Sequence, residues 1–169
     1  MEALAELEPP PGVLAIEVEA SDLNFADILQ CQGKYQVRLD PPFTPGMGAA
    51  GRVVRAGEGC RLIEGDRVVG PTVSGAGAYA EQALVIESQA TVISPAVSGA
   101  DAVATHVTYG TSWFGLFHRG SLKAGESVLV LAAAGGVGAA AVDLAKLKGC
   151  WVIAAAKTST DSPAFKEPR

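Results

Sequence analysis

A glycine-rich turn between an apolar run and a run of helix formers constrains the fold of this chain most. The turn is Ala132–Gly138 (AAAGGVG), and it joins Glu126–Leu131 (ESVLVL) to Ala139–Lys148 (AAAVDLAKLK). A continuous apolar run is typical of a buried parallel strand. A second such run, Trp151–Ala156, follows Gly149, which stands where helices often end. This order predicts one β-α-β unit with two parallel strands.

The composition of the turn also predicts chemistry. Small residues let the backbone approach a pyrophosphate, and the helix that follows offers unpaired N–H groups and the positive end of its dipole. Ala133, Gly135 and Gly138 occupy the three positions of the GxGxxG dinucleotide fingerprint. A tight turn that serves only close packing of the helix is the alternative.

The end of the second strand bears on which dinucleotide binds. NAD-specific units usually carry an acidic residue there, whereas this strand ends in Ala156, Lys157 and Thr158. A cation suits the 2′-phosphate of NADP, so Lys157 is a candidate contact for NADPH. A solvated lysine at the start of a polar tail, residues 158–169, is the alternative.

The chain ahead of this unit has a different pattern. Short β-rich runs separated by turn residues extend from Val13 to about Ser98 and predict a small β-barrel or sandwich. Leu23–Gln30 is expected to be a short helix. Ala100–His118 is expected to be a helix pair, or one helix with a break at Tyr109-Gly110. The expected strands are Val13–Glu19, Gly51–Arg55, Arg67–Gly70, Tyr79–Ile86 and Ala90–Ile93.

Composition restricts the class of protein. Hydrophobic residues make up 49% of the 169 residues, which is enough for a packed core. The net charge of −5 disfavours a protein that binds the nucleic-acid backbone. No apolar run approaches the ~18–20 residues that cross a bilayer. Three widely spaced cysteines form no disulfide framework, which fits a reducing compartment. We therefore expect a cytoplasmic protein without a nucleic-acid or membrane partner.

Several motifs, in order, resemble the zinc-free medium-chain dehydrogenase/reductase family, and within it the quinone oxidoreductase branch. They are DLNFADILQCQGKY, PFTPGMGAAGRV, EGDRVVG, TYGTSWFGLFHR and the glycine turn with its flanking runs. The resemblance spans about Val13 to Lys157. It implies a GroES-like β-barrel domain at residues 1–120, an incomplete Rossmann (β-α-β) unit at residues 121–157, and a polar tail at residues 158–169.

The resemblance implies a reductase in which NADPH lies between the two domains and passes a hydride to a small-molecule substrate, a quinone or an activated alkene (enone). By matching position, Asn24 and Tyr35 would line the substrate side, with Tyr35 able to donate to a carbonyl that gains negative charge. Helix-start hydrogen bonding is the alternative role for Asn24 and Asp27. Thr111 would contact the nicotinamide. The pyrophosphate would lie on Gly135, Gly136 and Val137.

The chain departs from the family pattern at three points. Gly48 stands where the family has a Glu two residues after Pro-Gly, and that carboxylate braces the site. The opening strand hairpin is missing or replaced, and the resemblance stops at about Lys157.

Zinc-dependent relatives use a Cys/His/Glu set, whereas His106 and His118 lie far from any cysteine in the sequence, so no metal is expected.

Three functions stay open at this point. The first is an NADPH-dependent reductase of the quinone oxidoreductase type, and the second is an enoyl-thioester reductase, which resembles the same motifs. The third is a shortened, catalytically incompetent member that acts as a binding or regulatory fragment. A lone β-α-β unit leaves a sheet edge and an apolar face uncovered, so a homo- or hetero-oligomer that covers them is an expected partner.

Overall fold

The computed structural model describes residues 7–157. The chain divides into two compact units, the first ending at His106 and the second beginning at Val107. Helix α2 (Gly99–Trp113) contributes residues to both units. The domain limits expected from the sequence, at residues 120 and 157, stay predictions.

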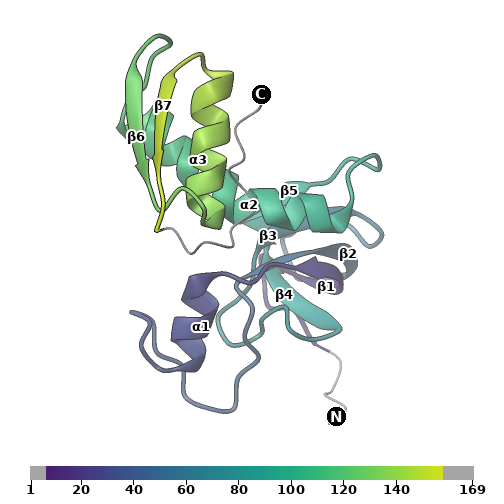
Figure 1. Ribbon diagram of the computed structural model, residues 1–169. Coiled ribbons are helices and arrows are strands. Elements are labelled where there is room, and N and C mark those ends of the chain that lie inside the picture. Colours follow the sequence, from purple (N-terminus) through teal and green to yellow (C-terminus); the bar gives the residue numbers. More distant parts are fainter. Residues whose placement is uncertain (1–6, 158–169) are drawn as a thin grey trace. The chain divides into compact units, whose positions relative to one another are not determined.

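The first unit is built on a five-stranded sheet with the strand order β4-β1-β2-β3-β5 (Figure 1). All four pairings are antiparallel. Its strands are β1 (Val13–Ser21), β2 (Gly48–Ala56), β3 (Arg67–Pro71), β4 (Gln82–Ile86) and β5 (Thr91–Val92), and it also carries helix α1 (Phe25–Cys31) and the short 3₁₀ helix η1 (Glu87–Gln89). The predicted β-rich unit is therefore confirmed.

One expected strand is shorter than its sequence indicates. We expect pairing from Tyr79 to Ile86, but β4 begins at Gln82. The Tyr79 N–H donates to the carbonyl oxygen of Pro45 at 3.0 Å. This hydrogen bond to the loop at Pro45 holds Tyr79 outside β4. The prediction is therefore wrong for the segment from Tyr79 to Glu81.

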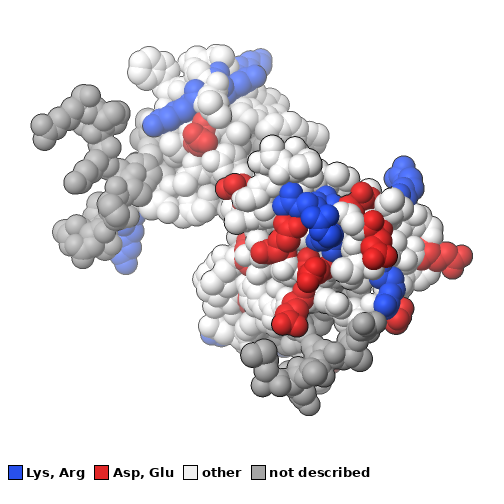
Figure 2. Space-filling model, turned by 90° about the vertical axis from the view of Figure 1, so that its right-hand side faces the viewer, with Lys and Arg blue, Asp and Glu red and all other residues white. Residues whose placement is uncertain are grey.

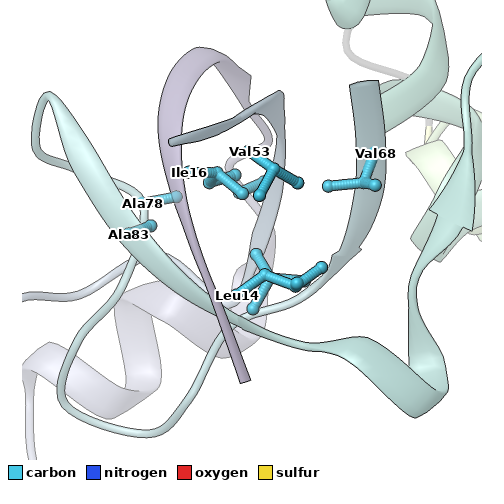
Figure 3. Packing of buried hydrophobic residues seen from close by; sticks show 8 residues of the cluster. Leu14, Ile16, Val53, Val68, Ala78 and Ala83 are labelled. Carbon is cyan, nitrogen blue, oxygen red and sulfur yellow. The ribbon is translucent and has the colours of Figure 1, made fainter. Parts of the chain in front are cut away.

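The core of the first unit follows the period-two pattern of β1. Leu14 and Ile16 project to one side of the sheet and are fully buried with Val53 and Val68 (Figure 3). The alternate positions of β1 are buried as well, because they pack in a second cluster. That cluster is formed by Val13, Ala15 and Leu84.

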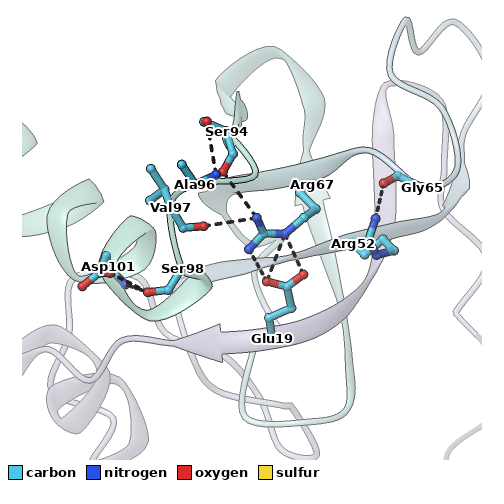
Figure 4. A network of polar contacts seen from close by, with 9 residues as sticks. All are labelled: Glu19, Arg52, Gly65, Arg67, Ser94, Ala96, Val97, Ser98 and Asp101. Atoms are coloured by element: carbon cyan, nitrogen blue, oxygen red, sulfur yellow. Dashed lines mark hydrogen bonds and ion pairs between the residues drawn. The ribbon is translucent and has the colours of Figure 1, made fainter.

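A charged contact joins β1, β3 and the loop that precedes α2. Arg67 Nη2 lies 2.6 Å from Glu19 Oε2, and Arg67 Nη1 donates to the carbonyl oxygens of Ser94 and Val97 (Figure 4). The hydrogen bond from Arg67 lowers the pKa of Glu19. Acidic and basic side chains lie interleaved on the face drawn in Figure 2.

The second unit contains the predicted β-α-β arrangement. Strands β6 (Ser127–Leu131) and β7 (Trp151–Ala155) pair in parallel, and α3 (Gly136–Leu147) lies between them in the chain. Gly149 has a φ of +82°, which confirms the predicted helix end. Val130 and Val142 are buried between the sheet and α3. The large exposed apolar side chains of the two strands are Leu129, Leu131, Trp151 and Ile153.

Helix α2 has no break at Tyr109-Gly110, so the expected helix pair or broken helix is wrong. It runs without interruption from Gly99 to Trp113 and continues as the π-helix η2 (Phe114–Arg119). A single internal glycine costs a helix only about 1 kcal/mol. The hydroxyl of the neighbouring Tyr109 donates to Asp143 Oδ2 of α3 at 2.9 Å. Within residues 7–157, no helix combines the length and apolar character of a membrane span.

Candidate functional site

The glycine turn prolongs the pairing of β6 and β7. The N–H of Ala133 donates to the carbonyl oxygen of Ala155 at 3.0 Å, and Ala133 is fully buried. Ala132 has a φ of +52°, in the left-handed region that residues with a side chain rarely adopt. Its carbonyl accepts from the N–H of Gly135 at 2.9 Å. The chain therefore reverses at Ala132, one residue before the first fingerprint position.

The last two fingerprint glycines have different steric requirements. A Cβ at Gly138 would overlap the carbonyl oxygen of Ala132 and lie 2.8 Å from the Cα of Ala133. At Gly135 the corresponding distance to the Ala132 oxygen is 3.4 Å, close to ordinary contact. Close packing of the helix therefore requires glycine at 138, whereas packing alone does not require it at 135.

The first turn of α3 presents backbone donors. In any α-helix the N–H groups of the first residues have no acceptor within the helix, and here they belong to Gly136, Val137 and Gly138. The intrahelical bonds begin with the N–H of Ala139, which donates to Gly135 at 2.7 Å. Gly136 and Val137 are exposed, and no acidic side chain lies in this turn. This end of α3 can therefore accept an anionic group.

Helix α2 supports the turn. Ser112 is buried, and its hydroxyl donates to the carbonyl oxygen of Val137 at 2.7 Å. The methyl group of Thr108 lies 3.1 Å from the place of a Cβ at Gly136. Thr111, the predicted nicotinamide contact, is exposed on the same helix. Sequence reasoning missed Ser112, since a serine inside an apolar run carries no spacing signal.

In the first unit, Asn24 and Asp27 define the start of α1. The Asp27 carboxylate is buried and accepts the N–H of Asn24 at 2.8 Å and that of Met47 at 2.9 Å. Asn24 and Asp27 form a capping box, so the helix-start role is confirmed for both residues. Asp27 also fixes the segment before β2. The side-chain nitrogen of Asn24 donates to Asp22 Oδ2 at 2.7 Å.

Two tyrosines lie around α1. Tyr35 follows the end of the helix, is half-buried, and its N–H donates to the carbonyl oxygen of Leu29 at 3.2 Å. Asn24 precedes the opposite end of α1. A helix of 7 residues is about 10 Å long, so the length of α1 separates the backbone of Asn24 from that of Tyr35. The phenol beside Asp22 belongs instead to Tyr79, which donates to the Asp22 carbonyl oxygen at 3.1 Å. Sequence reasoning missed Tyr79, because it lies in a loop far from Asp22 in the chain.

Lys157 is exposed two residues after β7. Among residues 7–157 there is no group of three or more His, Cys, Asp or Glu side chains that could hold a metal ion. The carboxylate of Asp66 accepts the N–H of Ile63 at 2.9 Å and so fixes the turn before β3.

Comparison with known proteins agrees with this architecture. Residues 10–96, a little more than half of the chain, match the alcohol dehydrogenase GroES-like domain. Quinone oxidoreductase-like protein 2 from Bos taurus is 44% identical over 137 residues, which are 80% of this chain and 38% of the relative. The chain belongs to the medium-chain dehydrogenase/reductase family, in its quinone oxidoreductase-like branch.

Solved members of the medium-chain dehydrogenase/reductase family show the same fold. The quinone oxidoreductase from Thermus thermophilus, also solved in complex with NADPH, has a TM-score of 0.78 and 36% identity, covering 94% of this chain and 50% of its own. The CurK enoyl reductase has a TM-score of 0.77 and 27% identity, covering 92% of this chain and 49% of its own. The GroES-like unit and the partial Rossmann unit expected from the sequence are thus confirmed. The chain spans 38% of the Bos taurus relative's length.

Proposed function

We propose that this chain binds NADPH through the glycine turn of its second unit and takes part in hydride transfer to a quinone or an activated alkene. The observation that carries the proposal is the exposed first turn of α3, with Gly136 and Val137 open to solvent behind a turn that requires glycine at 138. The Thermus thermophilus relative, which shares this fold, was solved with NADPH.

The residues at the turn fit a pyrophosphate. The N–H groups of Gly136, Val137 and Gly138 would donate to its oxygens, and a side chain at Gly135 or Gly136 would take up space beside them. Ala133 would keep the turn on the sheet, since it is buried and bonded to β7. Lys157 would meet the 2′-phosphate, and Thr111 the nicotinamide. NADPH, when bound, supplies the hydride.

The substrate side would be formed by Asn24 and Tyr35, as the family resemblance implies. Tyr35 carries a hydroxyl that can donate to a carbonyl oxygen as the oxygen gains negative charge. The side-chain amide of Asn24 offers both a donor and an acceptor. Its nitrogen donates one hydrogen to Asp22 and its oxygen belongs to the capping box of α1, which leaves the second amide hydrogen for a ligand.

Fluorescence titration of the purified chain with NADPH, with NADH as the comparison, tests this proposal. We expect saturable micromolar binding that is weaker for NADH. Lys157→Ala should bring the two affinities together, while Lys34→Ala, a change of another exposed lysine, should leave the preference intact. A folded sample that shows no saturation up to millimolar NADPH would overturn the proposal.

An enoyl-thioester reductase is the second candidate, favoured by the similarity to the CurK enoyl reductase. Oxidation of NADPH by a quinone and by an enoyl thioester, measured side by side, separates the two. The third candidate, a binding or regulatory fragment, is favoured by the exposed apolar side chains of β6 and β7. It predicts neither reaction, together with a partner or a second copy that covers the exposed side chains of β6 and β7, detectable by light scattering during gel filtration.

A further inference from the structure

Gly48 lies against a carboxylate. It is the first residue of β2, and the neighbouring residues Ser21 and Ala49 are paired between β1 and β2, which brings Asp22 beside it. A Cβ at position 48 would lie 2.6 Å from Asp22 Oδ1, closer than such atoms approach in proteins. The Asp22 carboxylate therefore occupies the space that a side chain at 48 would need. The family's Glu is absent at this place, but a carboxylate is present.

The two oxygens of Asp22 have different surroundings. Oδ2 accepts the side-chain N–H of Asn24 at 2.7 Å. Oδ1 is buried and has no hydrogen-bond donor among the described residues. A buried acceptor without a donor costs stability, and burial raises the pKa of Asp22, partly offset by the Asn24 hydrogen bond. The packing of the unit alone does not account for a carboxylate kept in this condition.

We propose that Asp22 is a positioning residue for Asn24, and that Gly48 is required because it leaves room for the Asp22 carboxylate. An ionised carboxylate accepts hydrogen bonds and donates none. It therefore selects the NH₂ end of the Asn24 amide and turns Asn24 Oδ1 to the Asp27 N–H, in the capping box that starts α1. The second hydrogen of the Asn24 NH₂ group is then left as a donor to an acceptor atom of the ligand. The inference rests on the proposed function in one respect, that Asn24 faces the substrate.

The selection depends on the charge of Asp22. A protonated Asp22 can donate, so it would accept either orientation of the Asn24 amide. The groups that act on Asp22 are Asp27 of α1, whose charge favours protonation, and His106 of α2, whose charge opposes it. Tyr79 touches only the backbone oxygen of Asp22. Asn24 should therefore lose its fixed orientation as the pH falls through the pKa of Asp22.

A pH titration of the whole chain by NMR, following the side-chain amide signal of Asn24, tests the proposal. In the unaltered chain the signal should shift with a midpoint above the ordinary aspartate value of about 3.9. In Asp22→Asn this shift should vanish. It should persist in Asp40→Asn, a matched change at an exposed carboxylate. An Asn24 signal that titrates alike in Asp22→Asn and in the unaltered chain overturns the inference.

Gly48→Ala gives a second test. The added Cβ should displace the carboxylate and move the Asn24 signal at neutral pH, whereas Gly110→Ala, where a Cβ meets no atom within 4 Å, should leave it in place. If Gly48→Ala does not fold, the double variant Asp22→Gly, Gly48→Ala should fold, because removal of the Asp22 carboxylate makes space for the Cβ at position 48. Folding of Gly48→Ala with an unmoved Asn24 signal contradicts the inference, as does failure of the double variant to rescue.

The test separates this inference from the proposed function, because the NMR signal requires no cofactor. Loss of NADPH binding with the expected Asn24 behaviour removes the proposed function and leaves the positioning of Asn24 standing. If NADPH binds normally but the Asn24 signal titrates alike in Asp22→Asn and in the unaltered chain, only the inference about Asp22 is overturned.

Discussion

The hydroxyl of Ser112 donates a hydrogen bond of 2.7 Å to the carbonyl oxygen of Val137, and this bond joins α2 to the first turn of α3. Ser112 is 4% exposed, so water cannot replace the hydroxyl. We expect Ser112→Ala to destabilise the second unit by about 1 kcal/mol and to weaken NADPH binding. Thermal unfolding and the NADPH titration measure the two effects. Unchanged stability would show that the bond contributes nothing.

Gly138 and Gly135 should respond differently to the same substitution. Gly138→Ala introduces a methyl group that overlaps the Ala132 carbonyl, so we expect a loss of about 1–3 kcal/mol or more. Gly135→Ala meets its nearest atom at 3.4 Å and should leave the unfolding midpoint nearly unchanged. Any effect of Gly135→Ala on NADPH binding then reports on the ligand rather than the fold. Equal destabilisation by both variants would contradict this reasoning.

Ala132 offers a stabilising substitution. Its φ of +52° costs a residue with a side chain roughly 1–2 kcal/mol, and glycine avoids this cost at the expense of some entropy. Ala132→Gly should therefore raise the free energy of unfolding by about 0.5–1 kcal/mol. Urea titration would measure it. A destabilised variant would mean that Ala132 does not adopt this conformation in solution.

The ion pair of Glu19 and Arg67 predicts a pH effect. The pKa of Glu19 is lowered in the folded chain, mainly by the hydrogen bond from Arg67. Its contribution to stability is therefore complete above the unfolded value of about 4.3 and is lost as the pH falls through the folded value. Glu19→Gln should lower the unfolding midpoint at neutral pH, and the difference from the unaltered chain should shrink as the pH falls below about 4.3. A pH-independent difference would contradict the assignment.

Tyr79 should be the tyrosine most resistant to ionisation. Burial, with the nearby charges of Asp27 and Asp22, raises its pKa to about 12. The preference for the neutral phenol stabilises the fold fully below the ordinary value of about 10, and this contribution is lost as the pH rises through about 12. Ultraviolet titration should lose its highest transition in Tyr79→Phe. Retention of that transition would assign it to another tyrosine.

The β-α-β unit was predictable from the sequence because its signals are local. Apolar runs, the glycine turn and Gly149 lie next to the elements that they define, and the structure places them accordingly. The continuity of α2 was not predictable. A single internal glycine costs a helix only about 1 kcal/mol, so Gly110 is compatible with a break and with a continuous helix.

The two halves of the candidate site differ in the same way. The donors of α3 follow from residues that are consecutive in the chain. Asp22 meets Gly48 only because β1 and β2 pair in one register, and Tyr79 reaches Asp22 only through its loop. A sequence motif can mark the absence of Glu at position 48, but only the pairing of the strands shows which residue takes its space.

The pairing of the strands has a consequence for local opening. In the first unit β1 and β2 each have a partner on both sides, so their amide hydrogens should exchange with solvent only through extensive unfolding. Within residues 7–157, β6 and β7 are paired only with each other, and their amides should exchange through smaller fluctuations. A dinucleotide bound at the end of β6 would slow exchange first in that strand pair, and the slowing would map its footprint without any measurement of catalysis.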